Sequence, residues 1–231
     1  MKLGRSKVGI RAPRSVGFST LRILLAVVAL TLVGFPVAQS ASADWEDEGK
    51  GFVIESGNYV AFGFNWIDEE FSSKVGQSST DKGFHNVDGN VKNAKGLNLL
   101  FGRRANGFFA IEGQFDYAQG FQFTDDDGDD FDLKVYTVTI NAKIFPFHEA
   151  LRPFNEGRLQ PYLVGGFGLM TTKDLDIDTG ASAAFRFGGG FDYHINNTWA
   201  FNTKISKLIP VGQLSGLKYV TYSAGFMMQI E

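Results

Sequence analysis

The chain has 231 residues, of which 44% are hydrophobic and 14% aromatic, and it contains no cysteine. This length corresponds to one domain, or to one domain behind a processed segment, and the lack of cysteine excludes disulfides and thiolate metal sites. Once the basic leader described next is removed, 16 basic residues face 25 acidic ones, and a formal net charge of −9 argues against binding to nucleic acid.

The first 43 residues are typical of a secretory signal peptide. Six basic residues and no acidic residue lie in this leader, and an apolar run of eleven residues extends from Ile23 to Val33. The run is shorter than the ~20 residues of a transmembrane helix but suits a signal-peptide core. Ala41 to Ala43 fits the pattern of a cleavage site. We expect a signal peptide over residues 1–43, a short periplasmic segment over 44–57 and one domain over 58–231; a retained anchor is the alternative.

Beyond Asn58 the sequence consists of eight segments in which apolar and polar residues alternate. Period-two alternation predicts β-strands with one apolar face. No long apolar stripe of helical period occurs in the same region, so the domain is predicted to be all-β. The eight segments are Tyr59–Asp68, Lys95–Arg104, Phe108–Ala118, Leu133–Phe145, Gln160–Thr171, Ala181–His194, Trp199–Leu208 and Lys218–Ile230.

The connections between these segments alternate in length. Glu69 to Asn93 is long and polar, Ala105 to Gly107 is a tight Asn-Gly turn, and Thr124 to Asp132 is an acidic loop. Long external loops and short periplasmic turns are typical of outer-membrane barrels. The connection from Pro146 to Leu159 is longer than that pattern predicts.

The two faces of the predicted strands indicate which one is inside. In the stretch AFRFGGGFDYHI, Phe185 and Phe187 share one register, whereas Arg186 and Asp192 share the other. Across the chain the second register is dominated by Gly, Ala, Ser, Thr and Asn, although a solvated face normally carries Lys and Glu. A closed barrel of eight strands has room inside only for its own side chains. We therefore predict that the apolar register faces lipid; a soluble β-sandwich or barrel is the alternative.

This second register, termed the lean register because small residues dominate it, also carries acidic and basic residues in equal number. Enclosed charges are tolerated only when they are paired and hydrogen-bonded, so we predict a neutral charge network in a plugged lumen. Its members are Glu112, Asp116, Lys143, Arg186, Asp192 and Lys204. Aromatic residues near the strand ends are predicted to form two interfacial girdles. These are Tyr59, Trp66, Tyr117, Tyr136, Tyr162, Tyr193, Trp199 and Tyr222.

Two stretches carry a family resemblance: QPYLVGGFGLMTT at Gln160–Thr172 and AFRFGGGFDYHINNTWAFNTKISKL at Ala184–Leu208. They resemble small outer-membrane β-barrel proteins of the OmpA/OmpX type. The resemblance implies an eight-stranded antiparallel transmembrane β-barrel, an up-and-down meander in a Gram-negative outer membrane, with both termini in the periplasm. It also implies folding by the barrel-assembly machinery. The chain departs from the family in ending on Gln229-Ile230-Glu231 instead of an aromatic residue, and we expect no peptidoglycan-binding domain.

The acidic loop is the most unusual local feature. Clustered carboxylates can bind Ca²⁺ or Mg²⁺, which makes weak metal candidates of Asp125, Asp126, Asp127, Asp129 and Asp130. The spacing is not that of an EF-hand, and a solvated surface loop is the stronger interpretation. Divalent ions that bridge the loop to lipopolysaccharide are the alternative.

The sequence predicts a structural or surface-interaction role, with no cofactor and no enzymatic activity. His194 follows Asp192 by two residues in the inward register, but no serine is close in sequence to complete a catalytic group. The expected partners are outer-membrane lipid, lipopolysaccharide and an unidentified surface partner at the external loops. The alternative is a narrow channel or carrier for small solutes or hydrophobic molecules, with a wall thinned by glycines: Gly165, Gly166, Gly168, Gly188, Gly189 and Gly190.

Overall fold

The computed structural model describes residues 56–69, 85–86, 94–124, 130–151, 156–173 and 181–230. Within these residues the chain is almost entirely β-strand, and the single helical element is the 3₁₀ turn η1, Gly212–Leu214. No helix in this part of the chain has the length and apolar character needed to cross a membrane. The expected signal peptide and most of the segment over 44–57 lie outside the described residues.

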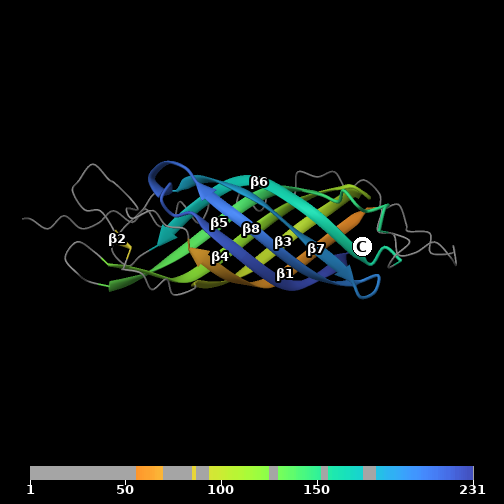
Figure 1. The fold of residues 1–231 in the computed structure, drawn as a ribbon, viewed down its shortest axis with the longest axis horizontal. Helices are drawn as coiled ribbons and strands as arrows, with labels where there is room; N and C mark the ends of the chain where they lie inside the picture. Colours follow the sequence, from red (N-terminus) through yellow and green to blue (C-terminus); the bar gives the residue numbers. More distant parts are fainter. Residues whose placement is uncertain are drawn as a thin grey trace, which may run out of the picture.

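Eight long strands form a closed antiparallel barrel, which confirms the predicted fold class (Figure 1). Each long strand pairs with the next along the chain, and β1 pairs with β9 to close the sheet. Closure removes the free edges that would otherwise expose unpaired backbone groups. A two-residue strand that the sequence did not predict, β2, pairs with the end of β4. The strands are β1 Gly57–Glu69, β2 His85–Asn86, β3 Ala94–Asn106, β4 Phe109–Thr124, β5 Asp130–Ile144, β6 Leu159–Lys173, β7 Ser182–His194, β8 Trp199–Pro210 and β9 Tyr219–Ile230.

The barrel has two unlike ends. At the turn end, marked by the C-terminal label in Figure 1, Asn58 of β1 pairs with Ile230 of β9. The connections at this end are residues 107–108, 145–158 and 195–198. At the opposite, loop end the connections are residues 70–93, 125–129, 174–181 and 211–218.

The hairpin of β4 and β5 extends further than predicted. The acidic loop was expected to span Thr124 to Asp132, but Thr124 pairs with Asp130 in the ladder. The apolar alternation explains the difference, because Phe123 and Phe131 continue it from both sides and pair with each other. A β-bulge between Ala118 and Phe121, where Gly120 adopts φ +93°, keeps the Phe121 side chain pointing into the barrel.

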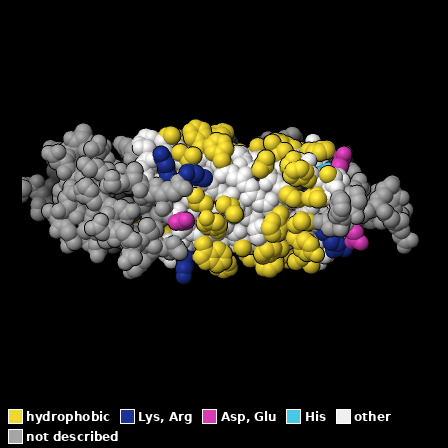
Figure 2. Space-filling model, in the orientation of Figure 1, with side chains coloured by type: hydrophobic (Ala, Val, Ile, Leu, Met, Phe, Trp, Pro, Cys, Tyr) yellow, Lys and Arg dark blue, Asp and Glu magenta, His cyan; other side chains and the backbone are white. Residues whose placement is uncertain are grey.

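The apolar register covers the outside of the barrel, and the lean register lies inside. Phe185 and Phe187 are exposed, whereas Arg186 and Asp192 are buried in the lumen. On the face that Figure 2 shows, the outer apolar side chains form a broad apolar band over the middle of the barrel, and the charged side chains lie at its borders. This pattern fits a surface that contacts lipid.

Candidate functional site

The lumen is filled by the barrel's own side chains, and its centre is a buried polar group organised around Asp116. The Asp116 carboxylate accepts hydrogen bonds from Asn65 Nδ2 at 3.1 Å and Gln114 Nε2 at 2.7 Å, and it forms an ion pair with Arg186. Asn65 in turn accepts hydrogen bonds from Asn98 and Ser223. The single charge of Asp116 is therefore held by partners from β1, β4 and β7.

Lys204 joins this group through an amide instead of a carboxylate. Its Nζ donates to Oε1 of Gln114 at 2.5 Å, and Asn141 Nδ2 approaches the same oxygen at 3.4 Å. Gln114 thus bridges Lys204 and Asp116, because its own amide nitrogen donates to Asp116. Lys204 is fully enclosed from solvent at 3% exposure.

A second buried ionic group centres on Lys143, closer to the turn end. Lys143 Nζ lies 2.7 Å from Asp192 and 3.3 Å from Glu112, and it stands over the Tyr162 ring at 3.8 Å from the centroid. Tyr59 donates its hydroxyl hydrogen to Glu112 at 2.7 Å, and Asn202 donates to Asp192 at 2.5 Å. The carboxylates are therefore both ion-paired and hydrogen-bonded, which offsets the cost of their burial.

The structure places all six predicted lumen charges inside the barrel, but in two groups. Asp116, Arg186 and Lys204 belong to the first, and Glu112, Lys143 and Asp192 to the second. The first group carries two cations and one anion, and the second the reverse. The six predicted charges therefore balance only when both groups are counted together, and a seventh buried charge, Arg104, adds one more cation.

Arg104 is a buried lumen charge that the sequence interpretation missed. Its guanidinium donates to Gly107 O at 2.5 Å, Asn106 O at 3.1 Å and Gln160 Oε1, and it stacks over the Phe145 ring at 4.0 Å. The signal was present, because Arg104 shares its register with the inward-facing Leu100 and Gly102. Its position as the last residue of a predicted strand concealed it. Arg104 is therefore buried at the turn end and bound to the turn between β3 and β4.

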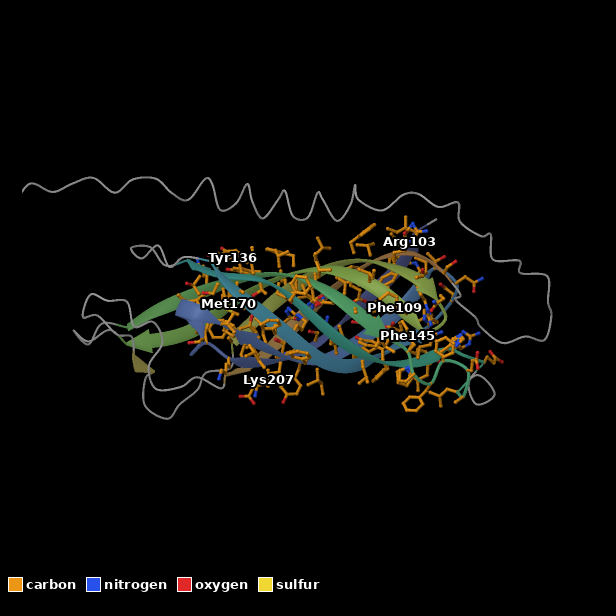
Figure 3. All side chains as sticks on the ribbon, turned by 90° about the horizontal axis from the view of Figure 1, so that it is seen from above. Arg103, Phe109, Tyr136, Phe145, Met170 and Lys207 are labelled. Atoms are coloured by element: carbon orange, nitrogen blue, oxygen red, sulfur yellow. The ribbon has the colours of Figure 1, made fainter. Side chains whose placement is uncertain are left out.

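Two apolar clusters lie on either side of the central polar group. The loop-end cluster consists of Ile67, Ala94, Ala118, Phe121, Leu133, Val135, Met170, Ala184, Leu208, Leu214, Leu217 and Tyr219. The turn-end cluster consists of Tyr59, Ala61, Leu100, Ala110, Phe145, Tyr162, Val164, Ala200 and Met227. Figure 3 labels Met170 in the loop-end half and Phe145 in the turn-end half.

Tyr59 and Tyr162 do not belong to the aromatic girdle, contrary to the prediction. Both are 3% exposed and lie in the lumen, where Tyr162 donates its hydroxyl hydrogen to Thr203 O at 3.0 Å. Each lies in the inward register, where a tyrosine hydroxyl can form a hydrogen bond within a buried polar or ionic group. Of the other predicted members, Trp66, Tyr193, Trp199 and Tyr222 are exposed, and Tyr117 and Tyr136 are half-buried and in mutual ring contact.

The remaining candidates from the sequence do not form a catalytic or metal site in the described residues. Asp125, Asp126, Asp127 and Asp129 lie outside those residues, and Asp130 begins β5. No group of three potential metal ligands occurs in the described part of the chain. His194 is buried at the turn end, and Asp192 is engaged by Lys143 and Asn202.

Comparisons with known proteins agree with this architecture. A family described as outer membrane protein beta-barrel domain matches residues 27–228. No curated protein matches the chain. The outer membrane protein OprG from Pseudomonas aeruginosa is 17% identical, with a TM-score of 0.56, over 79% of this chain and 99% of that one. Neisserial surface protein A is 12% identical, with a TM-score of 0.51, over 77% of this chain and 100% of that one. At such identities the similarity concerns the fold.

Proposed function

Because the chain belongs to the outer membrane protein beta-barrel domain family and is thereby an outer-membrane protein, we propose that it is a plugged, non-enzymatic scaffold. In this proposal the turn end and both termini face the periplasm, and the loop end faces outward and contacts surface partners. The barrel itself holds the protein stably in the membrane, and the connections at the loop end contact the surface partners.

The filled lumen is the observation that carries the proposal. An ion or solute that crossed the barrel would have to pass the loop-end cluster, the polar group around Asp116 and the ionic group around Lys143. Conduction requires polar sites that replace the hydration shell of the passing ion. Here the buried polar groups already bind one another, which favours a scaffold over a channel.

Among the described residues, the contacts of the inward-facing serines support a role without catalysis. The inward-facing Ser206 and Ser223 are hydrogen-bond partners of Arg186 at 3.4 Å and Asn65 at 2.7 Å. A hydrolytic group needs a nucleophile, a base and an orienting acid in mutual contact. His194 lies at the opposite end of β7 from Ser182, and Asp192 is committed to Lys143.

Single cysteines test the orientation, because the native chain contains none. Ser215→Cys lies exposed at the loop end, and Asn197→Cys lies exposed at the turn end. On intact cells, a membrane-impermeant maleimide is expected to label Ser215→Cys and to label Asn197→Cys only after the outer membrane is permeabilised. The reverse pattern would refute the proposed orientation.

Planar-bilayer recordings test the scaffold against the channel alternative. The purified protein is expected to insert without unitary conductance, with a general porin recorded in parallel as the positive control. Reproducible conductance steps would overturn the plugged scaffold and favour the narrow channel. A heat-dependent shift in gel mobility should accompany the recordings, to show that the inserted protein is the folded barrel.

A further inference from the structure

The turn between β3 and β4 holds an Asn-Gly pair in a built environment. Asn106 is exposed at the turn end, whereas Gly107 is buried. A backbone nitrogen reaches the preceding asparagine side chain most easily when it belongs to glycine, because glycine carries no Cβ to hinder the approach. Groups that favour such an attack surround this pair. They are the Phe108 backbone N–H, the Arg104 guanidinium and the His148 ring.

The side-chain amide of Asn106 is held over the turn. Its Oδ1 accepts a hydrogen bond from the Phe108 backbone N–H at 2.9 Å. This Asx turn closes a ring that includes the Gly107 nitrogen, so the side chain stays folded towards that nitrogen. The same N–H donates to the oxygen on which negative charge develops during attack on Cγ, which is the arrangement of an oxyanion hole.

Arg104 binds the peptide group that contains the attacking nitrogen. Its Nε donates to the carbonyl oxygen of Asn106 at 3.1 Å, and its Nη2 donates to that of Gly107 at 2.5 Å. When the Gly107 nitrogen loses its proton, the negative charge is shared with the Asn106 carbonyl oxygen. A buried guanidinium on that oxygen stabilises the charged form, and Arg104 is 3% exposed.

His148 lies against Gly107 from the connection between β5 and β6. A Cβ on Gly107 would overlap Nε2 of the imidazole, so the ring occupies the space where a side chain would be. The ring contacts Phe108 at 4.8 Å between centroids, and the His148 backbone N–H donates to Phe145 O at 3.3 Å. A histidine in this position can take and return a proton. The pair and the imidazole share a pocket that is open to solvent, lined by Ser56, Ala105, Asn106, Gly107, Phe108 and His148.

We propose that Asn106 and Gly107 form a self-modification site, at which Asn106 is converted to an isoaspartyl residue. His148 takes the proton of the Gly107 nitrogen, which bonds to Cγ of Asn106 while the carbonyl electrons move to Oδ1. The electrons then return, the bond from Cγ to Nδ2 breaks, and Nδ2 leaves as ammonia with the proton that His148 held. Water adds to the main-chain carbonyl carbon of Asn106 and breaks its bond to the Gly107 nitrogen, which takes a proton from that water. Water is thus consumed, and a carboxylate and ammonium are formed.

The product places a carboxylate on Arg104. In an isoaspartyl residue the chain continues through the side chain, so the former main-chain carbonyl of Asn106 becomes the free carboxylate. That carbonyl oxygen is the one to which Arg104 Nε donates. In the unmodified turn Arg104 donates to neutral oxygens of Asn106, Gly107 and Gln160. The modification therefore gives the seventh buried charge an anionic partner at the turn end.

Ageing of the purified, folded barrel in neutral detergent micelles tests the site. Peptide mass spectrometry measures the replacement of NH by O at Asn106, and labelling by an isoaspartyl methyltransferase identifies the product. The folded barrel is expected to convert Asn106 at least about tenfold faster than the same chain held unfolded in guanidinium chloride at equal pH and temperature. An equal or slower rate in the folded barrel would overturn the proposal, because the conversion would then reflect only the reactivity of the dipeptide.

Asn196 is an internal control in the same molecule. Its Oδ1 accepts hydrogen bonds from the backbone N–H groups of Thr198 at 2.9 Å and Trp199 at 2.7 Å, so it forms a similar turn at the same end of the barrel. The residue after it is Asn197, whose side chain hinders attack by the backbone nitrogen. Asn196 should stay unmodified during the time in which Asn106 is converted. Conversion of both residues at similar rates would refute a site built around Asn106.

Substitution of His148 tests the proposed base. His148→Gln is expected to slow the conversion at least about tenfold in the folded barrel and to leave the rate in guanidinium chloride unchanged. Phe147→Leu, at the exposed neighbouring position, is the matched control and should keep the wild-type rate. The gel-mobility shift on heating shows that each variant is folded. A wild-type rate in folded His148→Gln would overturn the proposal, and the comparison of folded with unfolded wild type decides it if His148→Gln shows no shift.

Discussion

Lys143 Nζ lies 2.7 Å from the carboxylate of Asp192, with both side chains at most 2% exposed, although 49 residues separate them in the chain. The same ammonium lies 3.3 Å from Glu112. One cation therefore compensates two buried carboxylates that come from β4 and β7. The ionic group links β4, β5 and β7, and its integrity depends on a single residue.

Substitution of Lys143 by methionine should destabilise the barrel severely. Lys143→Met keeps the volume but leaves Glu112 and Asp192 without their cation, and an uncompensated buried charge costs about 3–5 kcal/mol. Urea unfolding in lipid vesicles, followed by tryptophan fluorescence, measures the change. Lys134→Met, on the outer face of the same strand, is the matched control and should change stability by less than about 0.5 kcal/mol. Similar effects of the two substitutions would contradict the assigned ionic group.

Substitution of Lys204 should cost less than substitution of Lys143. Lys204 is bound by the neutral amide of Gln114, so Lys204→Met removes a buried cation and leaves one acceptor with a weaker bond. An unsatisfied buried acceptor costs about 1–3 kcal/mol, and the loss of the buried charge offsets part of it. Unfolding under the same conditions should therefore rank Lys204→Met between wild type and Lys143→Met. A loss of stability as large as that of Lys143→Met would indicate that Lys204, like Lys143, neutralises a buried carboxylate.

The sequence predicted the barrel because three patterns can be read from short stretches of the chain and accumulate along it. They are the alternation of apolar and polar residues, the positions of the turns and the small residues of the lean register. Strand number and the inward placement of Arg186 and Asp192 followed from period-two counting. Tyr59 and Tyr162 were assigned to the girdle from residue type, although their own register pointed inward. The split of the lumen charges into two groups depends on which strands face each other across the barrel, and that arrangement follows from the register of the closed sheet.

A substitution on the apolar outer face distinguishes contact with lipid from contact with water. Phe64 is 61% exposed and lies within the apolar band. Phe64→Lys should reduce stability in lipid vesicles, because a lysine on the lipid face of a barrel costs about 2–4 kcal/mol near the bilayer midplane. Phe64→Leu, which keeps the face apolar, is the control. If Phe64→Lys were neutral or more stable, the outer face would be in contact with water.

Two glycines of β6 should respond oppositely to the same added methyl group. A Cβ on Gly168 would overlap the carbonyl oxygen of Val138 and lie 2.6 Å from Cα of Thr139, and backbone on a paired strand cannot move aside. A Cβ on Gly165, three residues earlier, would meet only the Phe187 ring at 3.8 Å, an ordinary contact.

Gly168→Ala should therefore lose about 1–3 kcal/mol or more through overpacking, and Gly165→Ala should be neutral or slightly more stable because alanine loses less conformational entropy on folding. The two variants differ by the same single methyl group, so their comparison isolates the approach of neighbouring backbones. Unfolding midpoints in vesicles and the heat-dependent gel shift measure both. A tolerated Gly168→Ala would mean that β5 and β6 lie further apart than the structure places them, and that the small residues of the inward register are dispensable for closing the barrel.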